Sequence, residues 1–337
     1  MRLIRGLHNL RAMPEGCVAT IGNFDGVHKG HQVIIEQVKR KARELELPSV
    51  VMVFEPQPQE YFRGAQAPAR LMRFREKLLA LADQDIDLLI CLQFNHRVRK
   101  LTATDFVNQV LVSGLGVKHL VVGDDFRFGC DRSGDFHLLE QQGQLQGFGV
   151  EHTQTVGFVQ AGDAGKEAAD ALNEARISST RIRQALEAND FTLAEALLGR
   201  PYAISGCVIH GQKLGRQLGV PTANIALGRL RPALNGVYAV KVFRCKACLG
   251  EAGDVNETVD LDGWYGVANI GVKPTINGST PSLEVHIFNF AGELYGEHLR
   301  VVFCQRLREE QKFSGLDALK AQIATDINQA KSYFGVL

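Results

Sequence analysis

The first half of the chain alternates short apolar, β-branched runs with segments whose apolar residues recur every three or four positions. Such runs are typical of buried strands, and the wider spacing is typical of helices. Strands are predicted at Cys17–Ile21, Ser49–Phe54, Ile86–Phe94, His119–Gly123 and Val150–Gln160. Helices are predicted at His31–Leu47, Phe74–Gln84, Thr102–Ser113 and Gly134–Gly147. Strand–helix alternation predicts a parallel sheet with right-handed crossovers, covered by helices on both faces.

The pattern changes after a helical segment at Ser178–Gly199, which the Gly199-Arg-Pro201 sequence ends. From there on, short runs divided by Gly, Pro and Asn predict an antiparallel barrel. Its strands are expected at Tyr202–His210, Gly236–Arg244, Trp264–Gly271, Ser282–Asn289 and His298–Leu307. A final helix is predicted at Leu316–Phe334. The expected domains are therefore residues 1–199 and 200–337.

Composition narrows the class of protein. A chain of 337 residues is long enough for two domains, and its net charge of +1 argues against a broad nucleic-acid-binding surface. No run approaches the roughly 18 apolar residues of a membrane span, and residues 1–14 lack the apolar core of a secretory signal. Seven scattered cysteines argue against a disulfide framework. We expect a cytoplasmic protein that binds neither nucleic acid nor membrane, with a weak homo-oligomer left open.

A glycine-rich turn at Gly22–His31 follows the first predicted strand and leads into the first helix. Glycines let a phosphate approach the backbone, and the free N–H groups of a helix start attract anions. His28 and His31 are three residues apart, so both rings can meet one phosphate group. Two alternatives are a turn with incidental histidines and a metal site, for which Asp25 is the only nearby further ligand.

A second glycine-rich segment includes Gly211 and Gly215 and leads into Val220–Asn224. Backbone amides of such an arch can wrap a phosphate. Thr222 and Asn224 supply oxygen atoms of the kind that Mg²⁺ prefers. From these residues alone, a glycine-rich hairpin is an equally good interpretation.

The motifs together resemble one family, the bacterial bifunctional riboflavin kinase/FAD synthetases. Gly22–His31 resembles the His-x-Gly-His signature of nucleotidyltransferases in the form that this family uses. The other segments of the first half that match the family are Phe54–Pro58, Val122–Gly129 and Ile177–Arg183. The matching segments of the second half are Leu218–Ile225, Asn235–Val240, Gly266–Gly271, Leu283–His286 and Arg308–Phe313.

This resemblance implies a Rossmann-like α/β nucleotidyltransferase domain followed by an antiparallel β-barrel riboflavin kinase domain with a C-terminal helix. It implies that riboflavin and ATP give FMN, and that FMN and ATP give FAD with release of pyrophosphate. The implied cofactor is Mg²⁺, and the implied partners are the small-molecule substrates.

The resemblance also implies roles for single residues. His28 and His31 would bind ATP phosphates and stabilise the transition state, and Glu284 would be the general base of the kinase. Thr222 and Asn224 would hold Mg²⁺. The implied nucleotide-binding residues are Gly22, Asn23, Phe24, Asp25, Gly26, Asp124, Asp125, Arg127, Ser179, Thr180, Arg183, Gly211 and Gly215. A structural role for the Asp124–Arg127 group, and a merely solvent-facing Glu284, are the open alternatives.

Several rival interpretations are weaker. Class-I aminoacyl-tRNA synthetases use a related histidine signature, but the chain has no Lys-Met-Ser-Lys-Ser counterpart. A flavin-sensing regulator would carry a helix-turn-helix or a basic arm, and the sequence has neither. A chain with one surviving activity is a further alternative. The segment Arg244–Gly263 is longer than usual for the family, and its Cys245-x-x-Cys248 pair has no second pair at zinc-ligand spacing.

Overall fold

The computed structural model describes residues 1–153, 176–211, 215, 219–249, 255–260, 262–275 and 278–336. Its contacts divide the chain into two compact units. The first contains Met1–Pro68, Phe74–Ser179 and Leu249–Asn256, and the second contains Ala69–Arg73, Thr180–Cys248 and Glu257–Leu337. By their contacts, residues 180–199 group with the second unit. The domain boundary predicted between residues 199 and 200 stays a prediction.

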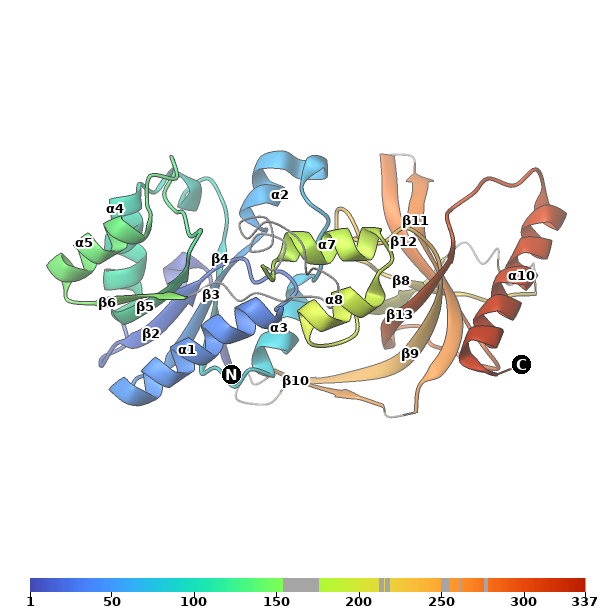
Figure 1. The fold of residues 1–337 in the computed structure, drawn as a ribbon, viewed down its shortest axis with the longest axis horizontal. Helices are drawn as coiled ribbons and strands as arrows, with labels where there is room; N and C mark the ends of the chain where they lie inside the picture. Colours follow the sequence, from blue (N-terminus) through green and yellow to red (C-terminus); the bar gives the residue numbers. More distant parts are fainter. Residues whose placement is uncertain are drawn as a thin grey trace, which may run out of the picture. The chain divides into compact units, whose positions relative to one another are not determined.

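The first unit is built on a six-stranded parallel sheet in the order β1-β4-β3-β2-β5-β6 (Figure 1). The strands are β1 (Arg2–Arg5), β2 (Cys17–Ile21), β3 (Ser49–Glu55), β4 (Leu88–Gln93), β5 (Val117–Gly123) and β6 (Gly149–Thr153). The chain passes from β2 to β3 on one side, and β5 lies on the other side of β2. Ligands of open α/β sheets bind where strand order reverses in this way, outside the carboxyl ends of the strands.

Helices cover both faces of this sheet. They are α1 (Lys29–Leu45), α2 (Pro58–Arg63), α3 (Phe74–Ala82), α4 (Ala103–Phe106), which runs into wider π-type turns at Val107–Leu115, and α5 (Phe136–Gln146). Cys17 and Ala19 pack with the buried face of residues 103–115, whereas Val18 and Val121 pack with Val38 of α1. The predicted parallel sheet buried on both sides is confirmed.

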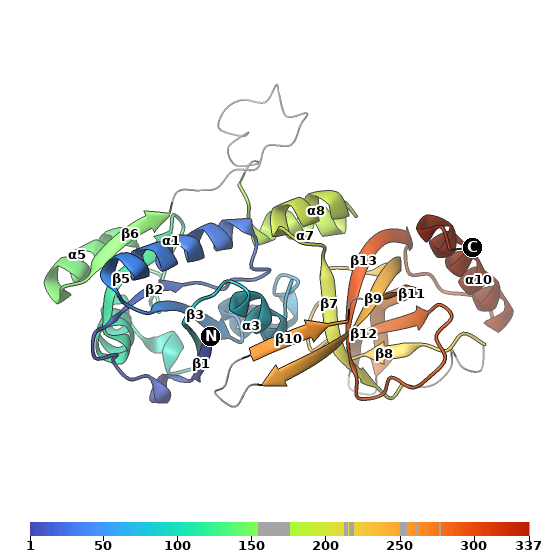
Figure 2. The same ribbon diagram turned by 90° about the horizontal axis from the view of Figure 1, so that it is seen from below.

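The second unit is an antiparallel barrel, shown in Figure 2. Its strands are β7 (Ala203–Ile209), β8 (Ala223–Ile225), β9 (Gly236–Leu249), β10 (Val255–Val259), β11 (Trp264–Thr275), β12 (Gly278–Ile287) and β13 (His298–Arg308). They follow the order β10-β9-β11-β12-β8-β7-β13, and pairing of β9 with β13 closes the barrel. The unit also contains α7 (Ser179–Glu187), α8 (Phe191–Leu198) and α10 (Leu316–Phe334). The predicted barrel with a C-terminal helix is confirmed.

Some elements differ from the expectation. The single helix predicted at Ser178–Gly199 is two helices, because Asn189 has a φ of 61° and Asp190 then caps α8 by accepting from the Leu193 N–H at 2.8 Å. The stretch Arg244–Gly263, expected to be longer than is usual for the family, continues β9 to Leu249 and includes β10, and residues 250–254 and 261 lie outside the described part. Of the strand predicted at Val150–Gln160, residues after Thr153 lie outside the described part.

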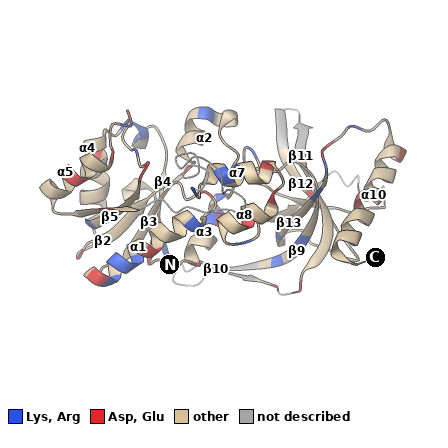
Figure 3. Cartoon of the chain, in the orientation of Figure 1, with Lys and Arg blue, Asp and Glu red and all other residues tan. Residues whose placement is uncertain are grey.

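Charge is distributed evenly over the described chain. Figure 3 shows basic and acidic side chains interspersed along the helices and strands. Within the described residues, no helix is long and apolar enough to cross a membrane.

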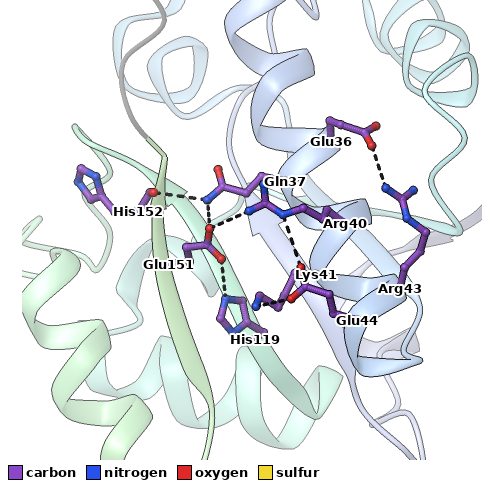
Figure 4. A network of polar contacts seen from close by, with 9 residues as sticks. All are labelled: Glu36, Gln37, Arg40, Lys41, Arg43, Glu44, His119, Glu151 and His152. Atoms are coloured by element: carbon purple, nitrogen blue, oxygen red, sulfur yellow. Dashed lines mark hydrogen bonds and ion pairs between the residues drawn. The ribbon is translucent and has the colours of Figure 1, made fainter.

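A polar network joins the edge strand β6 to α1 (Figure 4). Glu151 of β6 accepts from Gln37 and lies 3.2 Å from the Arg40 guanidinium, and its other oxygen lies 3.4 Å from His119 Nε2. Thr153 donates to the Gln37 amide oxygen at 2.7 Å. Burial of His119 lowers its pKa, and Lys41 adds to this effect, which Glu151 only partly offsets.

We predict that this lowered pKa makes stability fall as the pH drops. Below the ordinary pKa of histidine the unfolded chain takes up a proton that His119 in the folded chain resists, so the folded state loses stability. His119→Gln should therefore reduce, by a few degrees, the fall in Tm between pH 7.5 and pH 5.5. His96→Gln, at an exposed histidine, is the control. An unchanged pH dependence in His119→Gln would contradict the prediction.

Candidate active sites of the two units

The turn between β2 and α1 has an unusual backbone. Phe24, Gly26 and Val27 have φ values of 46°, 89° and 40°. Left-handed values are uncommon for residues other than glycine and are strained for a β-branched residue such as Val27. Phe24 and Val27 are nevertheless fully buried. Strain held in place by surrounding structure is a feature of functional sites.

The two histidines of the turn stack on each other. His28 is the N-cap of α1, and its Nδ1 accepts a hydrogen bond from the His31 N–H at 3.3 Å. The two ring centroids are 3.6 Å apart with the planes inclined by 16°. Because Nδ1 is the acceptor, neutral His28 carries its proton on Nε2. Gly30 leaves room for this ring, since a Cβ there would lie 3.2 Å from it.

Two side chains from distant segments hold the turn. Lys77 of α3 is fully buried and donates from Nζ to the Asn23 carbonyl at 2.6 Å. Ser179 donates from Oγ to the carbonyl of Asp25 at 2.8 Å, and Asp25 itself is buried. The predicted segment at 177–183 therefore begins beside the histidine turn. The sequence analysis did not single out Lys77 as a residue of this site. Its place on the apolar face of the predicted helix Phe74–Gln84 was the signal that could have indicated a buried, functional lysine.

The predicted residues at the end of β5 contact side chains of opposite charge or a histidine. β5 lies beside β2, so Asp124 follows the strand next to the histidine turn. The pairs are Asp124 with His152 at 2.9 Å, Asp125 with Arg176 at 3.0 Å, and Arg127 with Asp135 at 2.7 Å. These contacts support the structural alternative for the three residues. Their contact with a nucleotide stays a prediction.

The remaining residues of the first predicted site lie at the ends of the turn and in α7. Gly22 donates its N–H to the Met52 carbonyl of β3 at 3.1 Å. Thr180 follows Ser179 in α7, and Arg183 donates from Nε to the Ala69 carbonyl. The contact of Thr180 and Arg183 with pyrophosphate stays a prediction.

An aromatic cluster lies at the carboxyl ends of β3 and β4. Phe54, Tyr61 and Phe62 surround Phe94 with ring centroids 5.4–5.8 Å away, each in an edge-on contact. Phe62 is 61% exposed. Carboxyl ends of parallel strands share one edge, so this cluster, which sequence patterns did not single out, lies at the same edge of the sheet as the histidine turn.

The barrel brings the candidate kinase residues together on one face. Glu284 of β12 lies directly opposite Asn224 of β8. Its other cross-strand neighbour is Asn269 of β11. Opposite residues of antiparallel strands share a face, with Cβ atoms roughly 4.5–5.5 Å apart. His286, also on this face, contacts the Pro221 carbonyl through Nδ1 at 2.9 Å and so braces the segment that leads to Thr222 and Asn224.

The two glycines of the arch pack against the predicted magnesium ligands. A Cβ on Gly211 would lie 2.3 Å from the Asn224 amide nitrogen, and one on Gly215 would lie 3.2 Å from the Thr222 hydroxyl. A side chain at Gly211 would displace the Asn224 amide, and one at Gly215 would also meet the Val220 carbonyl at 2.4 Å. Among the described residues, no group of three His, Cys, Asp or Glu could hold a metal. Thr222 and Asn224, the residues predicted to hold Mg²⁺, supply oxygen atoms of the kind that this ion prefers, and their contact with the ion stays a prediction.

Comparison with known proteins identifies the family. Residues 10–162 match the FAD synthetase model, and residues 198–334 match the riboflavin kinase model. A bifunctional riboflavin kinase/FMN adenylyltransferase from Pseudomonas fluorescens is 52% identical over 98% of this chain and 97% of its own. One from Escherichia coli K12 is 48% identical over 100% and 99%. The chain belongs to this family.

The bifunctional architecture of the family extends over both units. A solved structure described as a macrolide-efflux protein from Streptococcus pneumoniae is 28% identical, with a TM-score of 0.71, and 97% of each chain is covered. The FAD synthetase match contains the histidine turn and the end of β5, and the riboflavin kinase match contains Thr222, Asn224 and Glu284. The histidine turn and the kinase residues therefore lie in the parts of the chain that match the corresponding families, and Ser179, Thr180 and Arg183 lie between the two matches.

Proposed function

We propose that this riboflavin kinase/FMN adenylyltransferase runs its two reactions at separate sites, within residues 200–337 and 1–199. Riboflavin and ATP give FMN and ADP at the barrel, and FMN and ATP give FAD and pyrophosphate at the parallel sheet. The observation that carries the proposal is the pairing of Glu284 with Asn224 in the barrel, while the His28–His31 pair lies in the other unit. We place the enzyme in the cytoplasm, where ATP is plentiful.

In the adenylyl transfer, a phosphate oxygen of FMN attacks the α-phosphorus of ATP. The new P–O–P bond forms as the bond to the β-phosphate breaks, and pyrophosphate leaves. Negative charge grows on the phosphate oxygens, and preorganised donors that face this charge lower the barrier. His28 has Nε2–H for this purpose, His31 stacks beside it, and both lie at the positive end of α1.

The rest of the turn and its neighbours would position the nucleotide. The turn itself consists of Asn23, Phe24, Asp25 and Gly26. Lys77 and Ser179 hold it by hydrogen bonds to its backbone carbonyls. Asp124, Asp125 and Arg127 would exchange ion pairs for ligand contacts, and Ser179, Thr180 and Arg183 would hold pyrophosphate. The exposed Phe62 and its aromatic neighbours offer a surface for the flat ring of FMN.

In the kinase reaction, Glu284 takes the proton of the riboflavin 5′-hydroxyl. The oxygen attacks the γ-phosphorus of ATP, the bond to the bridging β–γ oxygen breaks, and ADP leaves. Mg²⁺ held by Thr222 and Asn224 would neutralise charge on the ATP phosphates. The arch that contains Gly211 and Gly215 would wrap these phosphates with backbone N–H groups.

The purified protein incubated with riboflavin and Mg-ATP is expected to form FMN and ADP first, and then FAD and pyrophosphate. Chromatography separates the three flavins. Chelating Mg²⁺ with EDTA should stop FMN formation, and adding excess Mg²⁺ should restore it. If riboflavin gives no FMN, the kinase assignment fails, whereas failure to convert supplied FMN into FAD defeats the adenylyl-transfer assignment.

A further inference from the structure

One buried acceptor next to the kinase base has no partner. Asn269 of β11 lies directly opposite Glu284, and its Oδ1 is shielded from solvent without a hydrogen-bond donor in the described part of the chain. Buried polar atoms in folded proteins are nearly always hydrogen-bonded, and leaving one without a donor is unfavourable. An acceptor of this kind beside a candidate base is suited to a donor that arrives with the substrate.

The order of the strands shows from which side that donor comes. β12 lies between β8 and β11, so Asn224, Glu284 and Asn269 form a row across three strands on one face. The phosphates of ATP belong at the Asn224 end of this row, beside Thr222 and the glycine arch. Attacking and leaving oxygens of a phosphoryl transfer lie roughly in line. The attacking alcohol must therefore approach Glu284 from the β11 side, over Asn269.

The faces of β11 support this direction of approach. Ala268 and Ile270, which flank Asn269, are fully buried in the barrel core, so Asn269 projects from the opposite, outer face. Two positions further along this face, Gly271 leaves room for the Glu310 carboxylate, since a Cβ there would lie 1.8–2.6 Å from the carboxylate atoms. Towards Gly271 the outer face beside Asn269 is thus polar, as a hydroxylated chain requires, whereas in the other direction Val267 packs in an apolar cluster with Ala330.

We propose that Asn269 is a substrate-specificity residue of the kinase, whose Oδ1 accepts a hydrogen bond from a secondary hydroxyl of the ribityl chain. This inference rests on the proposed role of Glu284. The separation of roughly 4.5–5.5 Å between opposite Cβ atoms lets one chain of adjacent carbons present its terminal hydroxyl to Glu284 and an inner hydroxyl to Asn269. Asn269 thereby holds the 5′-hydroxyl at the base and discriminates against alcohols that lack the inner hydroxyls.

Asn269→Leu tests this inference, since it keeps the approximate volume and removes the acceptor. We expect kcat/KM for riboflavin to fall about 10- to 100-fold, as when a buried hydrogen-bonding group loses its partner, with KM for ATP unchanged. Conversion of supplied FMN into FAD should stay at the parent rate, and the unchanged KM for ATP in the kinase reaction shows that the barrel is folded. Gln305→Leu, an exposed amide on β13, is the matched control and should leave both reactions unchanged.

Riboflavin analogues that each lack one secondary hydroxyl identify the contact. The parent enzyme should be less active with one of these analogues than with riboflavin. Asn269→Leu should be equally active with that analogue and with riboflavin, because it already lacks the contact. Asn269→Asp keeps an acceptor at this position and should keep the discrimination between the analogues.

Other results would overturn the inference. Equal losses with every analogue in Asn269→Leu would make Asn269 a purely structural residue, and parent-like activity would show that it does not touch the substrate. If Glu284→Gln kept full kinase activity, the proposed role of Glu284 as the kinase base would be wrong. If Glu284→Gln lost activity but Asn269→Leu did not, only the proposed role of Asn269 would be wrong.

Discussion

Replacing His28 by alanine is expected to slow formation of FAD from FMN by about 10²- to 10³-fold, the usual loss when one donor to a developing phosphate charge is removed. The substitution removes the Nε2–H donor and the Nδ1 acceptor that holds the His31 N–H. It also removes the ring on which His31 stacks. FMN formation from riboflavin should stay near the parent rate, because His28 lies in the other unit. Both rates come from the same chromatographic assay, with riboflavin or FMN supplied.

Two further variants make this result specific. His96→Ala, at an exposed histidine of the same unit, should leave both reactions unchanged. His28→Gln places an amide donor near the position of Nε2 and should restore part of the lost rate if hydrogen bonding to phosphate is the role. If His28→Ala abolishes both reactions in a folded protein, the assignment of independent sites is wrong.

The first sheet could be predicted because its signals are local. The run Cys17–Ile21 is apolar at every position except Thr20, and the structure has β2 with these same bounds. The histidine turn follows directly from it, so its position outside the carboxyl end of a strand needs no long-range information. The two helices around Asn189 were merged into one, because a single left-handed residue interrupts the pattern without a glycine or proline to mark it.

The parts of the sites that escaped prediction depend on contacts between distant segments. Lys77 is 54 positions from Asn23, and only the packing of α3 reveals their hydrogen bond. β8 has three residues, too few to show an alternation, so the pairing of Asn224 with Glu284 could not be read from the sequence. Asn269 sits in a recognised motif, yet its position opposite Glu284 follows from strand register alone.

Replacing Glu284 by glutamine is expected to lower kcat for FMN formation by about 10²- to 10⁴-fold, the contribution typical of a general base. Glutamine keeps the shape and a hydrogen-bonding oxygen but cannot take the proton of the 5′-hydroxyl. KM values for riboflavin and ATP should change little, and FAD formation from supplied FMN should stay at the parent rate. The acid limb of the kinase pH–rate profile, which reports ionisation of the base, should disappear in the variant.

The chain offers a matched control for this substitution. Glu293→Gln makes the same chemical change at an exposed glutamate just after β12 and should leave both activities intact. Parent-like FMN formation in Glu284→Gln would mean that Glu284 merely faces solvent on a barrel strand. The pairing with Asn224 would then be a feature of the fold alone, and a different group would have to accept the proton. A raised KM for ATP with an unchanged kcat would instead indicate that Glu284 binds the magnesium–nucleotide complex and does not take the proton.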